Sequence, residues 1–156
     1  MSSVATRLSD EDFAQVVRFG ILSSIDIILR DPQGLIFVGR RSNEPAKGVY
    51  FVPGGVIRKN ERIADAFARI LAAETGLTMP FLQARLLGVY EHLYDTNRYG
   101  DPAYGTHYIV QGYQLRLATR PDIRLDAQHS DFRWTAPDAL LTAPDVHENT
   151  KVYLRP

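Results

Sequence analysis

The sequence predicts a mixed α/β fold in which helices pack on a curved sheet. Runs rich in β-branched and aromatic residues, as at 21–29 and 106–117, are bounded by polar turns and are typical of strands. Residues 55–77 instead repeat their apolar side chains at helical spacing. Strands precede and follow this helix without regular β-α-β alternation, which indicates a mixed architecture.

Composition indicates one domain over residues 1–156 with a single sizeable core. Lys plus Arg and Asp plus Glu both number 18, so no polyanion-binding surface is implied. The absence of cysteine excludes disulfides, thiolate nucleophiles and thiolate zinc sites. With no signal-peptide core and no membrane-spanning apolar run, we expect a cytoplasmic protein that binds neither nucleic acid nor membrane.

The first part of the chain predicts a short capped helix and then a β-hairpin. Ser9 precedes three acidic residues and can cap a helix over residues 10–17, because acidic side chains in a first turn complement the helix dipole. The apolar runs 21–29 and 35–39 flank a Pro-Gln-Gly turn, which predicts two antiparallel strands. Asp26 interrupts the first of these runs.

A third strand, over residues 49–52, leads into Pro53-Gly54-Gly55, where glycines allow a ligand or metal to approach the backbone. The helix within residues 55–77 follows, with Asn60 as its expected N-cap and Gly76 as a left-handed C-cap. Its apolar stripe comprises Ile63, Phe67, Ile70 and Glu74.

Glu74 is the unusual member of this stripe, one turn after Ile70. A carboxylate buried there without a partner would cost several kcal/mol or become neutral, whereas a bound divalent cation removes that cost. We therefore expect Glu74 to bind a metal. The alternative is that Glu74 is solvated at a frayed helix end.

The remaining chain predicts two long strands, polar loops and short helices. Expected strands cover 86–94, 106–117 and 132–134, polar loops cover 95–105 and 120–130, and a helix covers 137–141. The first strand carries His92 and the second begins near Tyr108, while the later loop contains Gln128 and His129. Asp145 is the expected cap of a last helix.

The stretch from Gly55 resembles the Nudix hydrolase signature. Five residues separate Gly55 from Glu61, and seven more separate Glu61 from Arg69. The signature then ends Arg-Glu-apolar-any-Glu-Glu-any-Gly, whereas residues 69–76 read Arg-Ile-Leu-Ala-Ala-Glu-Thr-Gly. Of the three clustered carboxylates only Glu74 remains. The resemblance implies a Nudix fold: an α/β/α sandwich with a curved mixed sheet and the Nudix loop and helix.

This altered box is similar to that of the GDP-mannose mannosyl hydrolases, a Nudix branch with Arg-Leu-Thr-any-Ala-Glu at this place. The likeness extends from about residue 10 to residue 153, and the supporting stretches are 11–14, 43–48, 51–55, 106–108, 128–129 and 145–147. The resemblance implies a homodimer that uses one Mg²⁺ per subunit. It also implies hydrolysis of GDP-mannose, and of GDP-glucose, to GDP and the free sugar.

By motif position, the resemblance implies three metal ligands: the Gly54 carbonyl, Glu74 and Gln128. It implies His129 as the general base. The other implied catalytic residues, which contact sugar or diphosphate, are Asp26, Arg41, His92 and Tyr108.

One position departs from the family, because Val56 stands where an arginine is expected. Neutralising the leaving diphosphate then falls to another cation, for which Arg58 and Arg40 are candidates. Glu61 and Arg69 are expected to form a structural ion pair within the box.

The reduced acidic cluster favours attack at carbon rather than at phosphorus. With Ile70 and Ala73 in place of carboxylates, the site holds fewer cations to activate water against an anionic phosphorus. Cleavage between the sugar C1 and its oxygen needs mainly a stabilised leaving group, which a diphosphate held by one Mg²⁺ and Arg41 provides. We expect inversion at C1, with His129 as base because its imidazole is mostly neutral above its ordinary pKa.

Two other functions stay open at this point. A Nudix enzyme of the usual kind would break the diphosphate P–O bond and yield GMP and a sugar phosphate, whereas a non-catalytic module would only bind a nucleotide sugar. The candidate residues also have structural interpretations. Asp26 satisfies a neighbouring group, Arg41 is a solvated strand end, His92 is a core histidine and Tyr108 is an ordinary strand residue.

Overall fold

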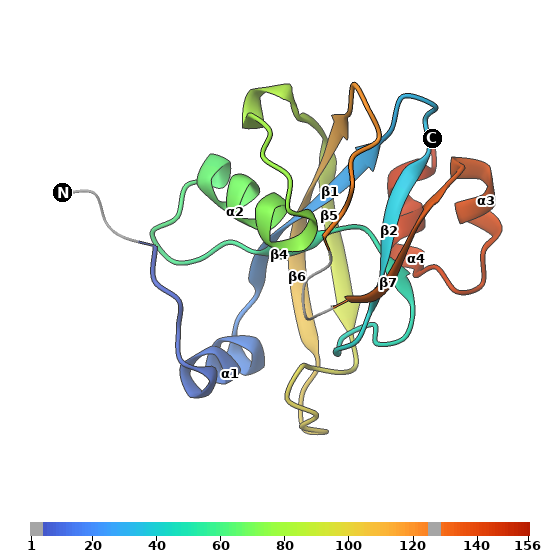
Figure 1. The fold of residues 1–156 in the computed structure, drawn as a ribbon. Helices are drawn as coiled ribbons and strands as arrows, with labels where there is room; N and C mark the ends of the chain where they lie inside the picture. Colours follow the sequence, from blue (N-terminus) through green and yellow to red (C-terminus); the bar gives the residue numbers. More distant parts are fainter. Residues whose placement is uncertain (1–4, 125–128) are drawn as a thin grey trace.

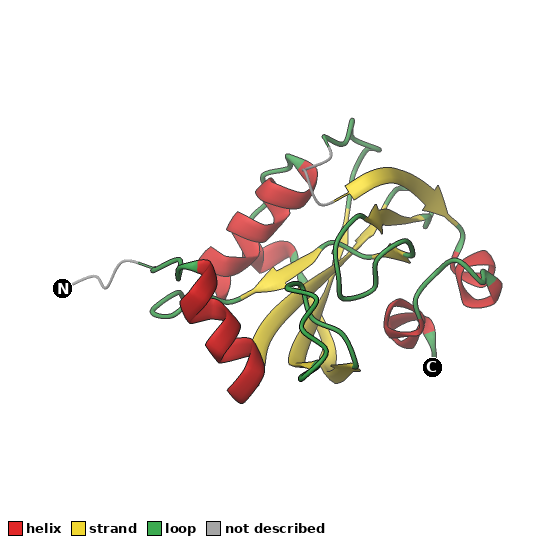
Figure 2. Cartoon of the chain, turned by 90° about the horizontal axis from the view of Figure 1, so that it is seen from below, coloured by secondary structure: helices red, strands yellow, loops and turns green. Residues whose placement is uncertain are grey.

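A computed structural model of the chain describes residues 5–124 and 129–156 and places one mixed sheet between helices (Figure 1). Seen from below, the longer helices α1 and α2 lie on one side of the sheet and the short C-terminal helices on the other (Figure 2). The elements in chain order are α1 (Asp10–Phe19), β1 (Leu22–Arg30), β2 (Ile36–Arg41), β3 (Tyr50–Phe51), β4 (Gly54–Val56), α2 (Ile63–Thr75), η1 (Phe81–Gln83), β5 (Arg85–Tyr94), β6 (Thr106–Arg116), β7 (His129–Thr135), α3 (Pro137–Thr142), α4 (Glu148–Lys151) and η2 (Val152–Leu154). The α/β/α sandwich with a mixed sheet is therefore confirmed.

Strand β1 is the centre of the sheet. It pairs in parallel with β6 along its whole length and antiparallel with β2 and β4. Strand β5 pairs antiparallel with β6 at one edge, and β3 and β7 both pair antiparallel with β2. Because both faces of β1 are covered, it buries apolar side chains on both sides, and Asp26 is enclosed within it.

Two apolar clusters fill the space on either side of the sheet. The cluster beneath α2 is built around Phe37, Phe67 and Leu115, which are almost fully buried. The cluster beneath the C-terminal helices includes Leu140 and Tyr153. Burial of these side chains supplies the main driving force for folding and fixes the strands between the two helical layers.

Glycines of the Pro53-Gly54-Gly55 turn let β4 lie very close to its neighbours. Gly54 is opposite Asp26 in the register with β1, and a Cβ on Gly54 would lie 2.2 Å from Asp26 Oδ1. A Cβ on Gly55 would lie 3.0 Å from Ile70 Cγ1 on α2. The turn therefore brings its backbone against both β1 and α2, as the two glycines indicated.

Several local expectations are confirmed. The Ser9 side chain accepts a hydrogen bond from the Asp12 backbone N–H at the start of α1, and Gly76 ends α2 in the left-handed conformation. The predicted hairpin forms, since Arg30 of β1 pairs with Ile36 of β2.

Two predicted helix caps are wrong. Arg62, which makes no side-chain capping bond, precedes α2, and Asn60 lies in the loop before it with a φ of 66°. His147 caps α4, where its Nδ1 accepts a hydrogen bond from the Asn149 N–H at 3.0 Å. Asp145 instead forms a two-bonded ion pair with Arg133 of β7.

The extents of two strands and the burial of one helical residue also differ from expectation. Strand β3 is shorter than the predicted strand over 49–52, and β7 is longer than the predicted one over 132–134. Ile63 begins α2 but is 40% exposed, so it does not belong to the buried stripe. Strand β3 pairs with β2 at only two residues. It ends at Phe51 because Pro53, two residues later, has no N–H to continue the ladder.

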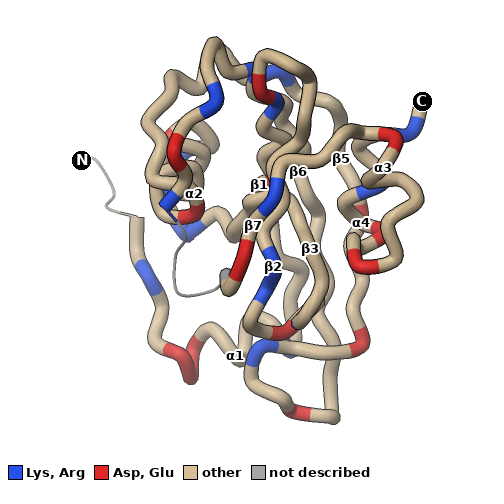
Figure 3. Tube along the Cα trace, turned by 45° about the vertical axis from the view of Figure 1, so that its right-hand side comes forward, with Lys and Arg blue, Asp and Glu red and all other residues tan. Residues whose placement is uncertain are grey.

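Lys and Arg are interspersed with Asp and Glu along the described chain (Figure 3). This agrees with equal numbers of the two kinds of charge in the sequence. Across the described residues, the structure contains no helix with the length and apolar character needed to cross a bilayer.

Candidate active site

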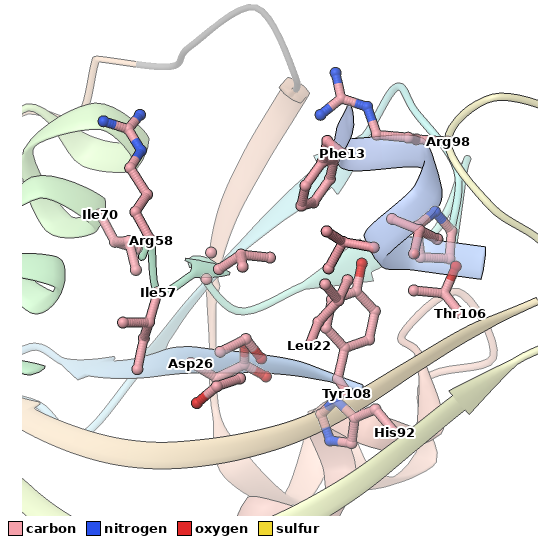
Figure 4. A pocket seen from close by; sticks show the side chains of 18 of the residues that line it. Phe13, Leu22, Asp26, Ile57, Arg58, Ile70, His92, Arg98, Thr106 and Tyr108 are labelled. Atoms are coloured by element: carbon pink, nitrogen blue, oxygen red, sulfur yellow. The ribbon is translucent and has the colours of Figure 1, made fainter. Parts of the chain in front are cut away.

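A cavity of about 720 Å³ lies between α1, α2 and the central strands. This volume is within the usual range for small-molecule sites. Its walls come from the segment before α1, from α1 itself, from β1, β4, β5 and β6, from the end of β2 and from α2. Figure 4 shows Asp26 low in the pocket, with Ile57 on one side and Tyr108 and His92 on the other.

The structure brings together four residues that the sequence predicted as catalytic. Asp26, Arg41, His92 and Tyr108 all line this cavity, although they come from four different strands. Parallel pairing of β1 with β6 and antiparallel pairing of β6 with β5 carry three of them to one region. In this register His92 lies directly opposite Tyr108.

Asp26 is a buried carboxylate with a short hydrogen bond. Its exposed fraction is 6%, and Tyr153 donates its hydroxyl proton to Asp26 Oδ2 at 2.5 Å. Burial raises the pKa of Asp26 to about 7, while the hydrogen bond from Tyr153 and the charge of Arg41 act in the opposite direction. The carboxylate thus changes charge near neutral pH.

His92 is buried among aromatic rings. It is 3% exposed, and its ring centroid lies 6.1 Å from those of both Phe51 and Tyr153. Burial lowers the pKa of His92 to about 4, with a further contribution from His147. His92 is accordingly a neutral imidazole at neutral pH, with its Nε2 3.4 Å from the Tyr153 hydroxyl.

Helix α2 contributes one carboxylate to the cavity wall. The four residues of this helix that line the cavity are Arg69, Ile70, Ala73 and Glu74. Glu74 is 7% exposed, so it lies on the buried side of the helix as its position after Ile70 predicted. Gly54, the second predicted metal ligand, lines the same cavity.

Cationic side chains lie at several places around the cavity. Arg41 lines it and donates from Nε to the Pro45 carbonyl at 3.0 Å, which holds the strand end against the following loop. Arg58 and Arg98 also line it and lie on opposite sides in Figure 4. Arg40 instead donates to the Gly48 carbonyl at an exposed position and does not line the cavity.

Two predicted site residues fall at the limit of the description. Gln128, the third predicted metal ligand, lies outside the described residues. The backbone of His129, the predicted base, begins β7 and pairs with Arg41 of β2, while its side chain is also outside the description. Among the described residues, no three His, Asp or Glu side chains gather in a group able to hold a metal.

The expected ion pair of the box is present. Arg69 Nε and Nη2 donate to the two carboxylate oxygens of Glu61 at 2.7 and 2.8 Å, and Nη2 also donates to the Val56 carbonyl. These hydrogen bonds keep the pKa of Glu61 below its ordinary value. The pair connects the loop at 57–62 to α2.

Sequence reasoning did not identify every residue of this region. It assigned no function to α1, yet Phe13 of that helix lines the cavity, with the Arg98 guanidinium 5.9 Å from its ring centroid. It also did not connect Tyr153 with Asp26. The only local signal for Tyr153 was its place beside Val146 and Thr150 on one side of the last helix. A contact between residues 127 positions apart has no local signature.

Comparison with known families gives one match over most of the chain. A model described as the NUDIX domain matches residues 21–155. The low-salt glycan biosynthesis protein Agl8 of Haloferax volcanii is 34% identical over 132 residues, which are 85% of this chain and 81% of that protein. An RNA pyrophosphohydrolase of Novosphingobium aromaticivorans is 32% identical over 131 residues, covering 78% of this chain and 80% of the relative.

Solved structures agree with this match at the level of the fold. The MutT protein of Methanosarcina mazei Go1 superposes with a TM-score of 0.70 at 18% identity. The superposition covers 86% of this chain and 90% of that protein.

Proposed function

This chain belongs to the Nudix family, and from that premise we propose that it hydrolyses GDP-mannose, and GDP-glucose, to GDP and free sugar. In this proposal water attacks the anomeric carbon rather than phosphorus. The chain is a Nudix hydrolase, and enzymes of this family act on small-molecule nucleotide derivatives. The 34% identical relative is named for glycan biosynthesis, which supports a substrate that contains a sugar.

The observation that carries the proposal is that α2 contributes few carboxylates to the cavity wall. Ile70 and Ala73 line the cavity at positions where the signature has carboxylates, and Glu74 is the acidic residue that α2 contributes. Attack on an anionic phosphorus benefits from several cations held by several carboxylates. Departure of a diphosphate from a sugar needs less activation of water, which suits a less acidic wall.

The residues present fit one divalent cation. Mg²⁺ prefers oxygen ligands and is often held by one or two carboxylates together with substrate phosphates. Glu74 and the Gly54 backbone, which line the same cavity, would hold it, with Gln128 as a third ligand. A bound Mg²⁺ would neutralise the charge of the leaving diphosphate.

The side chains of the cavity would perform the remaining steps. Arg41 binds the diphosphate, and Asp26, Tyr108 and His92 contact the sugar. His129 takes the proton from the attacking water; its backbone pairs with Arg41, which supports a place for it near the diphosphate. The water oxygen bonds to C1 as the bond from C1 to the phosphate oxygen breaks. The electron pair of the broken bond leaves with GDP.

Arg58 supplies the positive charge that an arginine at position 56 would otherwise provide. It lines the cavity, whereas the guanidinium of Arg40 is engaged with the Gly48 carbonyl outside it. Of the two candidates named by the sequence, Arg58 is the one that can reach a bound anion. The homodimer and the extent of the domain over residues 1–156 stay predictions.

A second function has one specific observation in its favour. The relative that is 32% identical is named an RNA pyrophosphohydrolase, an enzyme that acts on a phosphate chain. In that case this chain would break a P–O bond of a nucleotide sugar or of another nucleoside diphosphate derivative, and the product from GDP-mannose would be GMP rather than GDP.

Turnover of a panel of nucleotide sugars with Mg²⁺ tests the proposal. We expect GDP and free mannose from GDP-mannose, with β-mannose as the first anomer in proton NMR because a single displacement inverts the α-linked centre. Formation of GMP and mannose 1-phosphate would instead establish the second function. Tight binding of the panel without products would identify a non-catalytic module.

A further inference from the structure

Tyr153 lies directly behind the active-site cavity and contacts a carboxylate of its wall. It belongs to η2, near the C-terminus, and is 7% exposed. Its hydroxyl donates to Asp26 Oδ2 at 2.5 Å, at the short end of the range for a hydroxyl bonded to a carboxylate. Of the described residues, Asp26 lines the cavity and Tyr153 does not. Any effect of Tyr153 on substrate is therefore indirect, through Asp26 or through His92, which also lines the cavity and lies 3.4 Å from the hydroxyl.

The two oxygens of Asp26 have different neighbours. Oδ1 lies against Gly54, where even a single added Cβ would be 2.2 Å away. Oδ2 accepts the proton of Tyr153. A carboxylate can otherwise rotate about its Cβ–Cγ bond, because this torsion has broad minima. The close backbone on one side and the hydroxyl on the other select one orientation.

A glycine in β6 makes room for the Tyr153 ring. A Cβ on Gly112, in β6, would lie 2.8 Å from Tyr153 Cε1, so the ring lies against bare backbone of the sheet. Tyr90 packs edge to face on the same ring, with centroids 4.8 Å apart and planes at 85°. The His92 ring lies beside the hydroxyl, at 3.4 Å from Nε2. Packing on these sides fixes the hydroxyl before any substrate binds.

We propose that Tyr153 is a positioning residue, whose hydroxyl orients the Asp26 carboxylate toward the sugar of the bound nucleotide sugar. This inference rests on the proposed function, because it takes Asp26 as a contact of the sugar. Without the hydroxyl, Asp26 remains buried but samples orientations in which its contact with the sugar is lost. Binding of the nucleotide part, which does not involve Asp26, is unaffected.

The variant Tyr153→Phe removes the hydroxyl and keeps the ring. We expect its KM for GDP-mannose to rise by about tenfold, because a misoriented Asp26 loses its hydrogen bond to the sugar. The inhibition constant of GDP, which lacks the sugar, should stay within about twofold of wild type. A general loss of packing would weaken both ligands, so the difference between them separates positioning from structural damage.

The matched control is Tyr90→Phe, because Tyr90 packs on the Tyr153 ring. This change removes a tyrosine hydroxyl but leaves the bond from Tyr153 to Asp26 in place. It should leave both constants unchanged. In the double variant Asp26→Asn with Tyr153→Phe, KM should equal that of Asp26→Asn alone if the hydroxyl acts through this carboxylate, whereas a route through His92 would raise KM further.

Three results would overturn the inference: an unchanged KM in Tyr153→Phe, an equal weakening of GDP, or additive effects in the double variant. If Tyr153→Phe fails to fold, Gly112→Ala gives the same test, because its methyl group displaces the ring while the hydroxyl is kept. Release of GMP by the wild-type enzyme would refute the proposed function separately. The Tyr153→Phe and Tyr90→Phe comparison would then be made on that reaction, with GMP as the sugar-free ligand.

Discussion

At the scale of single residues, Asp26 and His92 are buried groups whose pKa values move in opposite directions. Burial raises the pKa of Asp26 from 3.8 to about 7 and lowers that of His92 from 6.5 to about 4. Each shift favours the neutral form, because charge is poorly solvated in the interior. The folded protein therefore keeps a proton on Asp26 that the unfolded chain releases, and it excludes a proton from His92 that the unfolded chain binds.

These shifts give stability an interpretable pH dependence. Asp26 contributes most below its unfolded pKa, and this contribution is lost as pH rises through the window from 3.8 to about 7. His92 contributes above 6.5, and its contribution is lost as pH falls toward about 4. Between these limits the two slopes oppose each other, so the wild-type curve alone does not separate them.

The variant Asp26→Asn isolates the aspartate. The free energy of unfolding of wild type minus that of Asp26→Asn should decrease as pH rises from about 4 to about 7, because the amide does not titrate. Urea unfolding of the metal-free protein at several pH values measures this difference. Asp122→Asn, at an exposed position in the loop after β6, is the control for the loss of an exposed carboxylate. A flat difference for Asp26→Asn would contradict the buried, protonated carboxylate.

At the scale of elements, the loop before α2 is held by one ion pair with little access to solvent. The Glu61 side chain is 4% exposed and that of Arg69 is 28% exposed. The hydrogen bond from Arg69 to the Val56 carbonyl ties the same guanidinium to β4. The Arg69 guanidinium thus joins α2, β4 and the loop that carries Arg58 into the cavity wall, in addition to backbone bonds from that loop to Ser23 and Thr6.

Replacing Arg69 by Met should therefore destabilise the fold. The change leaves the Glu61 carboxylate with the Arg58 backbone N–H but without its cationic partner, and breaking a buried ion pair in this way typically costs about 3 to 5 kcal/mol. Chemical denaturation of the metal-free protein checks this value. The control is Asp145→Asn, which breaks a pair whose side chains are 33% and 48% exposed and should cost less than about 1 kcal/mol. Equal losses in the two variants would contradict the structural role of the Arg69 pair.

Elements also show what local sequence could and could not predict. Periodicity located α2, and Gly76 marked its end, because the left-handed C-cap is a local property of the chain. Asn60 was a poor guide to its start, since the loop is shaped by the distant Arg69 pair and leaves Asn60 outside the first turn. Asp145 was likewise an apparent cap, but Arg133 on β7 engages its carboxylate. Both errors come from partners that no local pattern contains.

At the scale of the whole molecule, the cavity results from strand order. The parallel pairing of β1 with β6 and the antiparallel pairing of β5 with β6 set Asp26, Tyr108 and His92 around one cavity. Composition and periodicity predicted the strands and the hairpin of β1 with β2, but not the other strand pairings. Resemblance to a family supplied the site residues, and the structure gathered Asp26, Arg41, His92, Tyr108, Gly54 and Glu74 around one cavity. Tyr153 escaped prediction because only the folded topology places it beside Asp26.

The central claim is that solvent oxygen bonds to carbon and not to phosphorus. Hydrolysis of GDP-mannose in ¹⁸O-labelled water, followed by mass spectrometry of both products, tests it most directly. Attack at C1 places the label in mannose and leaves GDP unlabelled. Label in a phosphate group, with unlabelled sugar, would contradict the account and assign this enzyme to cleavage of the P–O bond.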